Sequence, residues 1–154
     1  MKITYKGDYA LKALFELALK HEKEGDGVTS ITEIAKLGDM PTKFLEQILL
    51  ALRKGGFVKS KRGIRGGFSL ARPAKDITVG EVIRFIEGPI EPISCVEEGR
   101  YKGCKDVASC IFRSVWKEIA LATSKIVDSL TFADLILKYK EKKKRAKSIA
   151  DYTI

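Results

Sequence analysis

The sequence is poor in the residues on which enzymes and secreted proteins depend. Its 154 residues include one histidine, His21, and three cysteines. A disulfide framework uses paired cysteines, so an odd number favours a reducing compartment and a metal, a cluster or a reactive thiol. Because His21 is distant in sequence from every cysteine, a Cys–His nucleophilic pair is hard to assemble. We therefore expect no enzymatic activity.

Long apolar runs are also missing. No stretch of about 18 apolar residues could form a transmembrane helix, and the first six residues lack the apolar core of a signal peptide. The sequence thus predicts a cytoplasmic protein with no membrane partner. Its 154 residues are enough for one domain, or for a small domain with an appendage.

Positive charge, in contrast, is abundant. The formal net charge is +9, from 29 Lys and Arg against 20 Asp and Glu. Residues 1–75 carry 15 basic and 8 acidic side chains and residues 138–154 carry 7 and 2, whereas residues 76–137 carry 7 and 10. A basic surplus favours a polyanionic partner, either nucleic acid or an acidic membrane surface. The slightly acidic middle of the chain holds all three cysteines.

Hydrophobic periodicity predicts three helices in the N-terminal half. The first is expected over residues 8–24, and the second over residues 31–37, where Ser30 and Glu33 have the spacing of a capping box. The third follows a proline and ends at a Gly-Gly pair, with an apolar stripe at helical spacing. That stripe consists of Leu45, Ile48, Leu49 and Leu52. A short turn separates the second helix from the third, which is the arrangement of a helix-turn-helix motif.

Polar side chains at the start of the third helix lie together, centred about 140° from its apolar stripe. They are Thr42, Lys43, Glu46 and Gln47. Two β-prone runs follow at residues 57–62 and 68–70, and the Gly-rich turn between them predicts a hairpin. Its basic residues are Lys59, Lys61, Arg62 and Arg65. A helix-turn-helix followed by a basic hairpin is a winged helix.

The C-terminal half is predicted to be helical around one irregular loop. Thr78 and Glu81 have capping-box spacing ahead of a helix that Gly88 ends. After a loop, residues 106–130 lack Gly and Pro and carry a continuous apolar stripe. We interpret them as a dimerisation helix of about 24 residues, about 36 Å long; a helix folded back on its own domain is the alternative. A last helix is expected from Thr131 into a lysine-rich tail, which either attracts DNA or is a frayed, solvated end.

The predicted fold is therefore mainly α with a small β-hairpin wing: a winged helix-turn-helix plus a long dimerisation helix. We divide it into a winged-helix DNA-binding domain at residues 1–88 and a cysteine-bearing sensor loop at residues 89–109. The dimerisation helix and C-terminal helix would occupy residues 106–147, and a tail residues 148–154.

Several segments, taken in order, resemble the Rrf family of bacterial winged-helix transcription regulators, the IscR/NsrR/CymR type. They are Gly7-Asp8-Tyr9-Ala10-Leu11, Phe44-Leu45-Glu46-Gln47-Ile48-Leu49, Leu52-Arg53-Lys54-Gly55-Gly56-Phe57-Val58, Arg62-Gly63-Ile64-Arg65-Gly66-Gly67-Phe68, Glu87-Gly88-Pro89-Ile90, Trp116 and Thr131-Phe132-Ala133-Asp134-Leu135. The resemblance implies a homodimer of winged-helix protomers joined by long crossed helices. Such a dimer would read a pseudo-palindromic operator in double-stranded DNA.

The resemblance also implies DNA-contacting residues. Base contacts would fall at Lys43, Glu46 and Gln47, and Arg62 would enter the minor groove. These roles suit the chemistry, because Gln pairs with adenine, a carboxylate accepts from cytosine, and Arg is favoured in a narrow minor groove. The other wing cations are better suited to phosphates, which position the protein without specifying sequence. The alternative is that all of these are solvated surface residues.

The cysteines follow the pattern Cys95-x8-Cys104-x5-Cys110. Cluster-binding members of the family carry three cysteines in this loop and at the start of the long helix, whereas CymR-like members lack the trio. The resemblance thus implies an iron–sulfur cluster, whose usual ligands are thiolates. The x8 gap is longer than in IscR, which leaves 2Fe-2S and 4Fe-4S both open. Alternatives are buried thiols acting as small hydrophobes, a zinc site, or a metal-free thiol switch.

Three cysteines leave a fourth ligand to be found. IscR-like members use a histidine at a position that Arg113 occupies here. NsrR-like members use an aspartate from the other subunit at the position of Asp8, although an Asp is also favoured by the dipole of a helix start. Two functions follow. The first is a regulator that senses iron–sulfur status, nitric oxide or redox state, and the second is a cluster-free regulator of cysteine or sulfur metabolism controlled by a partner protein or by thiol oxidation. The cysteine trio favours the first.

Overall fold

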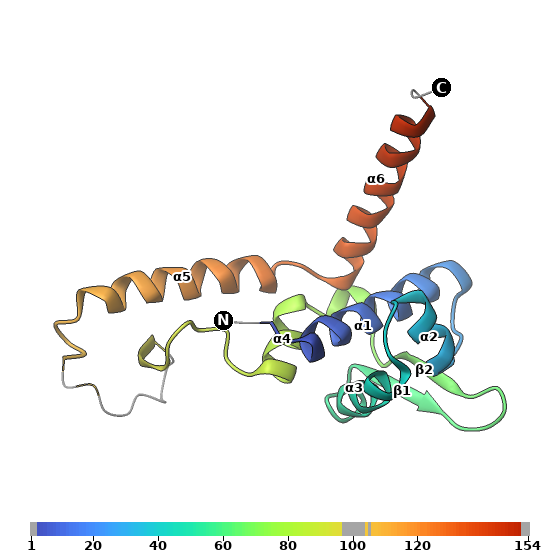
Figure 1. Ribbon diagram of the computed structural model, residues 1–154, viewed down its shortest axis with the longest axis horizontal. Helices are drawn as coiled ribbons and strands as arrows, with labels where there is room; N and C mark the ends of the chain where they lie inside the picture. The colour runs from blue at the N-terminus through green and yellow to red at the C-terminus, as the bar shows by residue number, and fades with distance from the viewer. Residues whose placement is uncertain (1–2, 97–103, 105, 152–154) are drawn as a thin grey trace.

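The computed structural model describes residues 3–96, 104 and 106–151 of the chain (Figure 1). Helices dominate it, together with one small sheet, in this order: α1 (Tyr5–Glu24), α2 (Ile31–Leu37), α3 (Thr42–Lys54), β1 (Val58–Lys61), β2 (Gly67–Leu70), the 3-10 turn η1 (Ala74–Asp76), α4 (Val79–Glu87), the 3-10 turn η2 (Ser94–Val96), α5 (Ile111–Asp128) and α6 (Phe132–Asp151). This arrangement confirms the predicted mainly α fold with a β-hairpin wing.

Helix α1 lies at the centre of the core. Its buried side chains face α2, α3, α4, α6 and β2. The side chains of the predicted apolar stripe are at most 3% exposed; they are Ala10, Leu14, Leu17 and Ala18. The helix begins at Tyr5, a turn earlier than periodicity predicted. The N-cap residue is Thr4, whose hydroxyl accepts from the Gly7 backbone N–H at 3.4 Å. The Glu87 carboxylate at the end of α4 in turn accepts hydrogen bonds from the backbone N–H and the hydroxyl of Thr4.

The helix-turn-helix pair forms as its capping residues predict. The Ser30 hydroxyl accepts from the backbone N–H of Glu33 at 3.2 Å and opens α2. The return half of the capping box is missing, because the Glu33 side chain pairs with Lys20 on α1 instead. That ion pair raises the pKa of Lys20 and ties α2 to the central helix. Helix α3 then buries its predicted leucine and isoleucine stripe against α1 and α2.

The wing is an antiparallel hairpin in which Val58 pairs with Leu70 and Lys61 with Gly67. A third segment adds to its edge, since Thr29 and Phe68 exchange two backbone hydrogen bonds of 2.8 Å. The hairpin is thereby joined to the segment that enters α2. Its position relative to the helix-turn-helix is fixed by backbone bonds as well as by packing.

Helix α5 is shorter than predicted. It has 18 residues, and the turn at residues 106–109 precedes it, where the Ser109 backbone N–H donates to the Asp106 carbonyl. Cys110, with extended backbone, is its N-cap residue. The predicted start at residue 106 was wrong because the absence of Gly and Pro permits a helix without requiring one. Helix α6 continues through residue 151.

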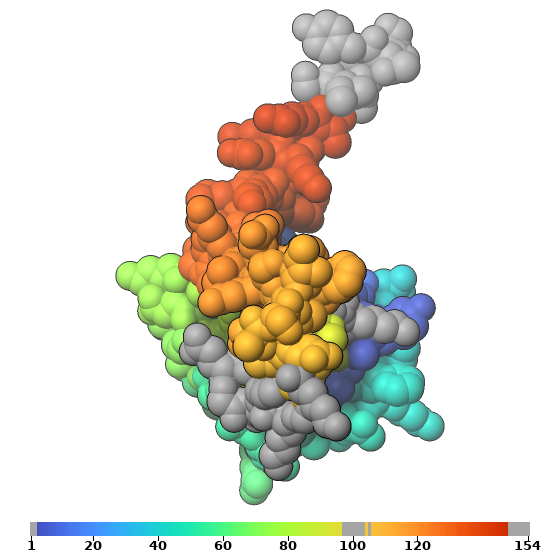
Figure 2. All heavy atoms as spheres, turned by 90° about the vertical axis from the view of Figure 1, so that its left-hand side faces the viewer, coloured from blue at the N-terminus to red at the C-terminus, as the bar shows by residue number. Residues whose placement is uncertain are grey.

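The molecule has two projections from the winged-helix body (Figure 1). Helix α5 extends sideways from the body, and α6 rises from the side opposite to α3 and the wing. Figure 2 looks at the molecule from the N-terminal end of α5, with this helix at the front of the view. None of the described helices is long and apolar enough to span a bilayer.

Candidate functional site

The predicted DNA-reading residues of α3 are all exposed. Thr42, Lys43, Glu46 and Gln47 occupy its first two turns, opposite the buried stripe. Pro41 is the N-cap residue and makes no side-chain cap hydrogen bond, so its side chain satisfies none of the first backbone N–H groups of α3. This end of a helix is favourable for phosphate oxygens. The chemistry of this face fits base edges flanked by backbone phosphates.

The wing presents its cations to solvent. Lys59, Lys61, Arg62 and Arg65 are exposed, and the tip residue Ile64 is fully so. The turn is tight: the Gly66 backbone N–H donates to the Gly63 carbonyl at 2.8 Å, and a Cβ at position 66 would collide with the Lys61 carbonyl. The glycines therefore hold the two arginines on a narrow loop that can enter a groove.

Helix α3 and the wing are held together at one side of the body. The Arg53 guanidinium at the end of α3 donates to the Ser60 hydroxyl of β1 at 3.1 Å. In Figure 1 both elements lie along the lower edge, while the lysine-rich α6 points the other way. The structure thus brings the two predicted groups of DNA-contacting residues onto one surface. Their contacts with DNA stay a prediction.

The cysteines lie outside the winged-helix core. Cys95 is in η2 and is half-buried, Cys110 caps α5 and is also half-buried, and Cys104 is exposed. The Arg113 guanidinium, one turn into α5, donates to the Cys95 carbonyl at 3.1 Å and so joins η2 to the start of α5. Residues 97–103 and 105, which belong to the predicted sensor loop, lie outside the described residues.

A metal site is not assembled in the part of the chain that the structure describes. Within residues 3–96, 104 and 106–151, no three His, Cys, Asp or Glu side chains lie together as ligands. Asp8 is in the first turn of α1 and pairs with Lys12 at 2.8 Å. His21, for which no role was expected, is 3.6 Å from Asp26 at the far end of α1. The donor set still fits an iron–sulfur cluster in kind, since the side chains of Cys95, Cys104 and Cys110 are thiols, the usual ligands of such clusters.

Two features were not foreseen from the sequence. One is an apolar groove of about 370 Å³, lined by the aromatic rings of Tyr5, Tyr9 and Phe44. It lies beside the exposed polar residues of α3, which we call the reading face, and Gln47 is part of its lining. The signal for it was the position of Phe44, which lies outside the apolar stripe of α3. The other is an ion pair between Arg84 on α4 and Asp128 on α5. These residues are 44 positions apart, and no local pattern links them.

Comparison with known proteins decides the family. The family model named Rrf2, described as an iron-dependent transcriptional regulator, matches residues 3–138. The chain belongs to the Rrf2 family. This confirms the resemblance of the sequence motifs and makes the protein a member of a family of DNA-binding transcription regulators.

Individual members of the Rrf2 family are similar over most of their length. An rrf2-like HTH-type transcriptional regulator of Rhodobacter capsulatus is 42% identical over 87% of this chain and 91% of its own. The structure of CymR, the global cysteine regulator of Bacillus subtilis, matches with a TM-score of 0.73 at 36% identity over 90% of this chain and 98% of that one. The structure of T. potens IscR matches with a TM-score of 0.71 at 33% identity over 92% and 90%.

Proposed function

We propose that the protein is a homodimeric transcription regulator that reads a pseudo-palindromic operator. The observation that carries this proposal is the exposure, on one surface, of the polar start of α3 and the basic wing loop. Helix α3 would lie in the major groove, where Gln47 and Glu46 can distinguish adenine and cytosine edges. Arg62 would enter the adjacent minor groove, and the wing lysines would bind phosphates.

The dimer would form through α5. Its apolar side chains Ile111, Val115, Ile119 and Ile126 are between 43% and 76% exposed in the single chain. A monomeric protein rarely exposes such a continuous apolar surface, which is typical of an interface. Figure 1 shows this helix projecting from the body, so a second copy can reach it without displacing the winged-helix domain. A twofold axis through the paired α5 helices would present two reading faces to two half-sites.

The signal would be received at the cysteines. Cys95, Cys104 and Cys110 would hold an iron–sulfur cluster, with Asp8 of the second copy as the fourth ligand. When bound, a cluster supplies an iron–sulfur centre that is reactive towards oxidants and nitric oxide. The chain's own contribution is positional: the bond from Arg113 to the Cys95 carbonyl joins the cysteine region to the start of the dimerisation helix.

The first experiment measures iron, acid-labile sulfide and the visible spectrum of protein purified without oxygen. A cluster sensor should contain stoichiometric iron and sulfide, and C95S, C104S and C110S should each lose them. S109A is the matched control, because Ser109 is next to Cys110 and its hydroxyl has no expected ligand role. A colourless wild-type protein that resists reconstitution would contradict the cluster but not DNA binding.

A second function is favoured by the similarity to CymR, the global cysteine regulator of B. subtilis. In this alternative the protein is a cluster-free regulator of cysteine or sulfur metabolism, controlled by a partner protein or by thiol oxidation. The same cysteine variants distinguish the two. Metal-free wild-type protein whose DNA affinity changes on mild oxidation, and whose cysteine variants do not respond, would support the alternative.

A further inference from the structure

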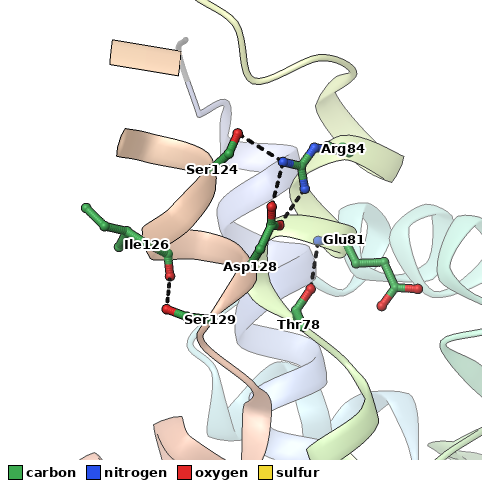
Figure 3. A network of polar contacts seen from close by, with 7 residues as sticks. All are labelled: Thr78, Glu81, Arg84, Ser124, Ile126, Asp128 and Ser129. Atoms are coloured by element: carbon green, nitrogen blue, oxygen red, sulfur yellow. Dashed lines mark hydrogen bonds and ion pairs between the residues drawn. The ribbon is translucent and has the colours of Figure 1, made fainter. Parts of the chain in front are cut away.

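Helices α4 and α5 meet at a polar contact between Arg84, Ser124 and Asp128 (Figure 3). Together with Gly80, which lies against Asp128, these residues make up what we call the α4–α5 junction. The two terminal nitrogens of Arg84 bind the two carboxylate oxygens of Asp128, at 2.5 Å and 2.9 Å. One of them also donates to the Ser124 hydroxyl at 3.1 Å. A two-point contact between a planar guanidinium and a carboxylate fixes direction as well as distance.

Gly80 permits this contact. It lies in the first turn of α4, where a Cβ would overlap the Asp128 carboxylate and come within 2.9 Å of both Arg84 and Val127. A helical glycine costs about 1 kcal/mol relative to alanine. The side chains of Asp128, Arg84 and Val127 occupy the space beside Gly80, which is the physical reason for a glycine at this position.

The rest of the attachment is at the same end of α5. The Val79 backbone N–H donates to the Leu130 carbonyl at 2.9 Å, and that of Phe132 donates to the Ile77 carbonyl at 3.0 Å. The chain leaving α5 is thus bonded to the chain entering α4. The other end of α5 meets η2 through the bond from Arg113 to Cys95. Helix α5 is therefore anchored to the winged-helix body at its C-terminal end.

We propose that Arg84 and Asp128 set the angle between α5 and the winged-helix body, and thereby the spacing of the two DNA half-sites. The inference rests on the proposed function, because it requires α5 to join two protomers. Helix α5 has 18 residues and so is about 27 Å long. A rotation of about 10° at its anchored end would move the other end by about 5 Å, more than the roughly 3.4 Å rise of one base pair.

The pair is suited to setting geometry rather than to holding the fold together. Its side chains are 37% and 45% exposed, and ion pairs at such sites contribute little to stability. The hydrogen bond to Asp128 raises the pKa of Arg84 further, so the guanidinium stays charged. Loss of the pair should leave the domain folded and the reading face unchanged, while freeing the angle of α5.

The test is selection from a pool of random-sequence duplex DNA by the full-length protein and its variants. R84M and D128N remove the two-point contact from either side, and D128N retains the volume of the carboxylate. K140M is the matched control, because Lys140 and Glu22 form an ion pair of similar exposure, 48% and 39%, away from the junction. Melting temperatures and sedimentation confirm that each variant is folded and dimeric.

The expected result is that wild type and K140M enrich paired half-sites at one spacing. R84M and D128N should enrich the same half-sites, with the preference for that spacing over spacings one base pair longer or shorter reduced at least about threefold. An unchanged single spacing in both variants would overturn the inference, as would variable spacing in the wild type. Folded variants that no longer bind single half-sites would overturn it too. Failure of the wild type to enrich any paired half-sites would instead overturn the proposed function.

Discussion

At the scale of single residues, Arg62 tests whether the wing reads sequence. It is exposed on the loop between β1 and β2, where a guanidinium can enter a minor groove without disturbing the core. R62A should weaken binding to a selected operator by about 1–3 kcal/mol while changing binding to unrelated DNA much less. Fluorescence anisotropy with both duplexes measures the difference. Equal losses on the two duplexes would make Arg62 a phosphate contact.

Lys61 should behave differently from Arg62. As an exposed wing cation suited to a phosphate, it should contribute equally to every DNA sequence. K61A should therefore weaken both duplexes alike and reduce the slope of log affinity against log salt by about 0.9. Titrations at several salt concentrations provide the slope. A slope equal to that of the wild type would remove Lys61 from the interface; K140A, on the opposite side of the body, is the control.

Asp134 should make the folding stability of the protein depend on pH. Its carboxylate accepts from the Thr131 backbone N–H at 2.9 Å and from the Thr131 hydroxyl at 2.6 Å, and the hydroxyl bond is the main cause of its lowered pKa. A lowered folded pKa means that the stabilisation is present above the unfolded value of about 3.9 and is lost as pH falls through the folded value. The melting temperature of the wild type should exceed that of D134N near pH 6, and the difference should shrink below about pH 4. A difference that stays constant down to pH 3 would contradict this role.

At the scale of elements, Gly80 tests whether the approach of α4 to α5 matters. An added methyl group cannot coexist with the present position of the Asp128 carboxylate, so G80A should displace the ion pair. Stability should change by no more than about 1 kcal/mol, because the gain in helix propensity offsets the lost pair. The preference for one half-site spacing should weaken as in R84M. The double variant G80A/R84M should show no further loss of that preference. G27A, where a Cβ would meet nothing within 4 Å, is the control.

The elements themselves were largely predictable where local signals define their ends. Ser30 and Thr78 cap α2 and α4 as their spacing predicted, and Gly25 and Gly88 end α1 and α4 with positive φ. The two ends that were missed depend on distant or weak signals. The start of α1 has Thr4 as its N-cap, and Thr4 is also bound by Glu87, which is 83 positions away. The start of α5 follows a turn that contains no glycine or proline.

At the scale of the whole molecule, the residues that make up the candidate site were more predictable than the contacts between elements that are distant in the sequence. The period of α3 placed its polar residues outward, because a buried stripe fixes the rotation of a helix. The junction of Arg84 with Asp128 could not be predicted, since contacts between distant charged residues depend on how helices pack. The cysteines were found by count and placement, and residues 97–103 and 105 of the predicted sensor loop lie outside the described residues.

The dimer is the property on which the proposed function most depends, and α5 tests it. Val115 and Ile119 lie on its exposed apolar stripe, and in a twofold interface each substitution acts twice. Burial of one such side chain contributes about 1.5–3 kcal/mol, so V115E or I119E should weaken the dimer by about 3–6 kcal/mol, or more than about a hundredfold. Sedimentation equilibrium measures the dissociation constant. K117E, on the opposite face of α5, should leave the dissociation constant of the dimer within about threefold of the wild-type value.

The monomeric variants should still bind single half-sites weakly but lose binding to paired half-sites, because linkage of two DNA-binding faces creates the additional affinity. A wild-type dissociation constant in both stripe variants would mean that another surface joins the protomers, and that α5 does not determine half-site spacing.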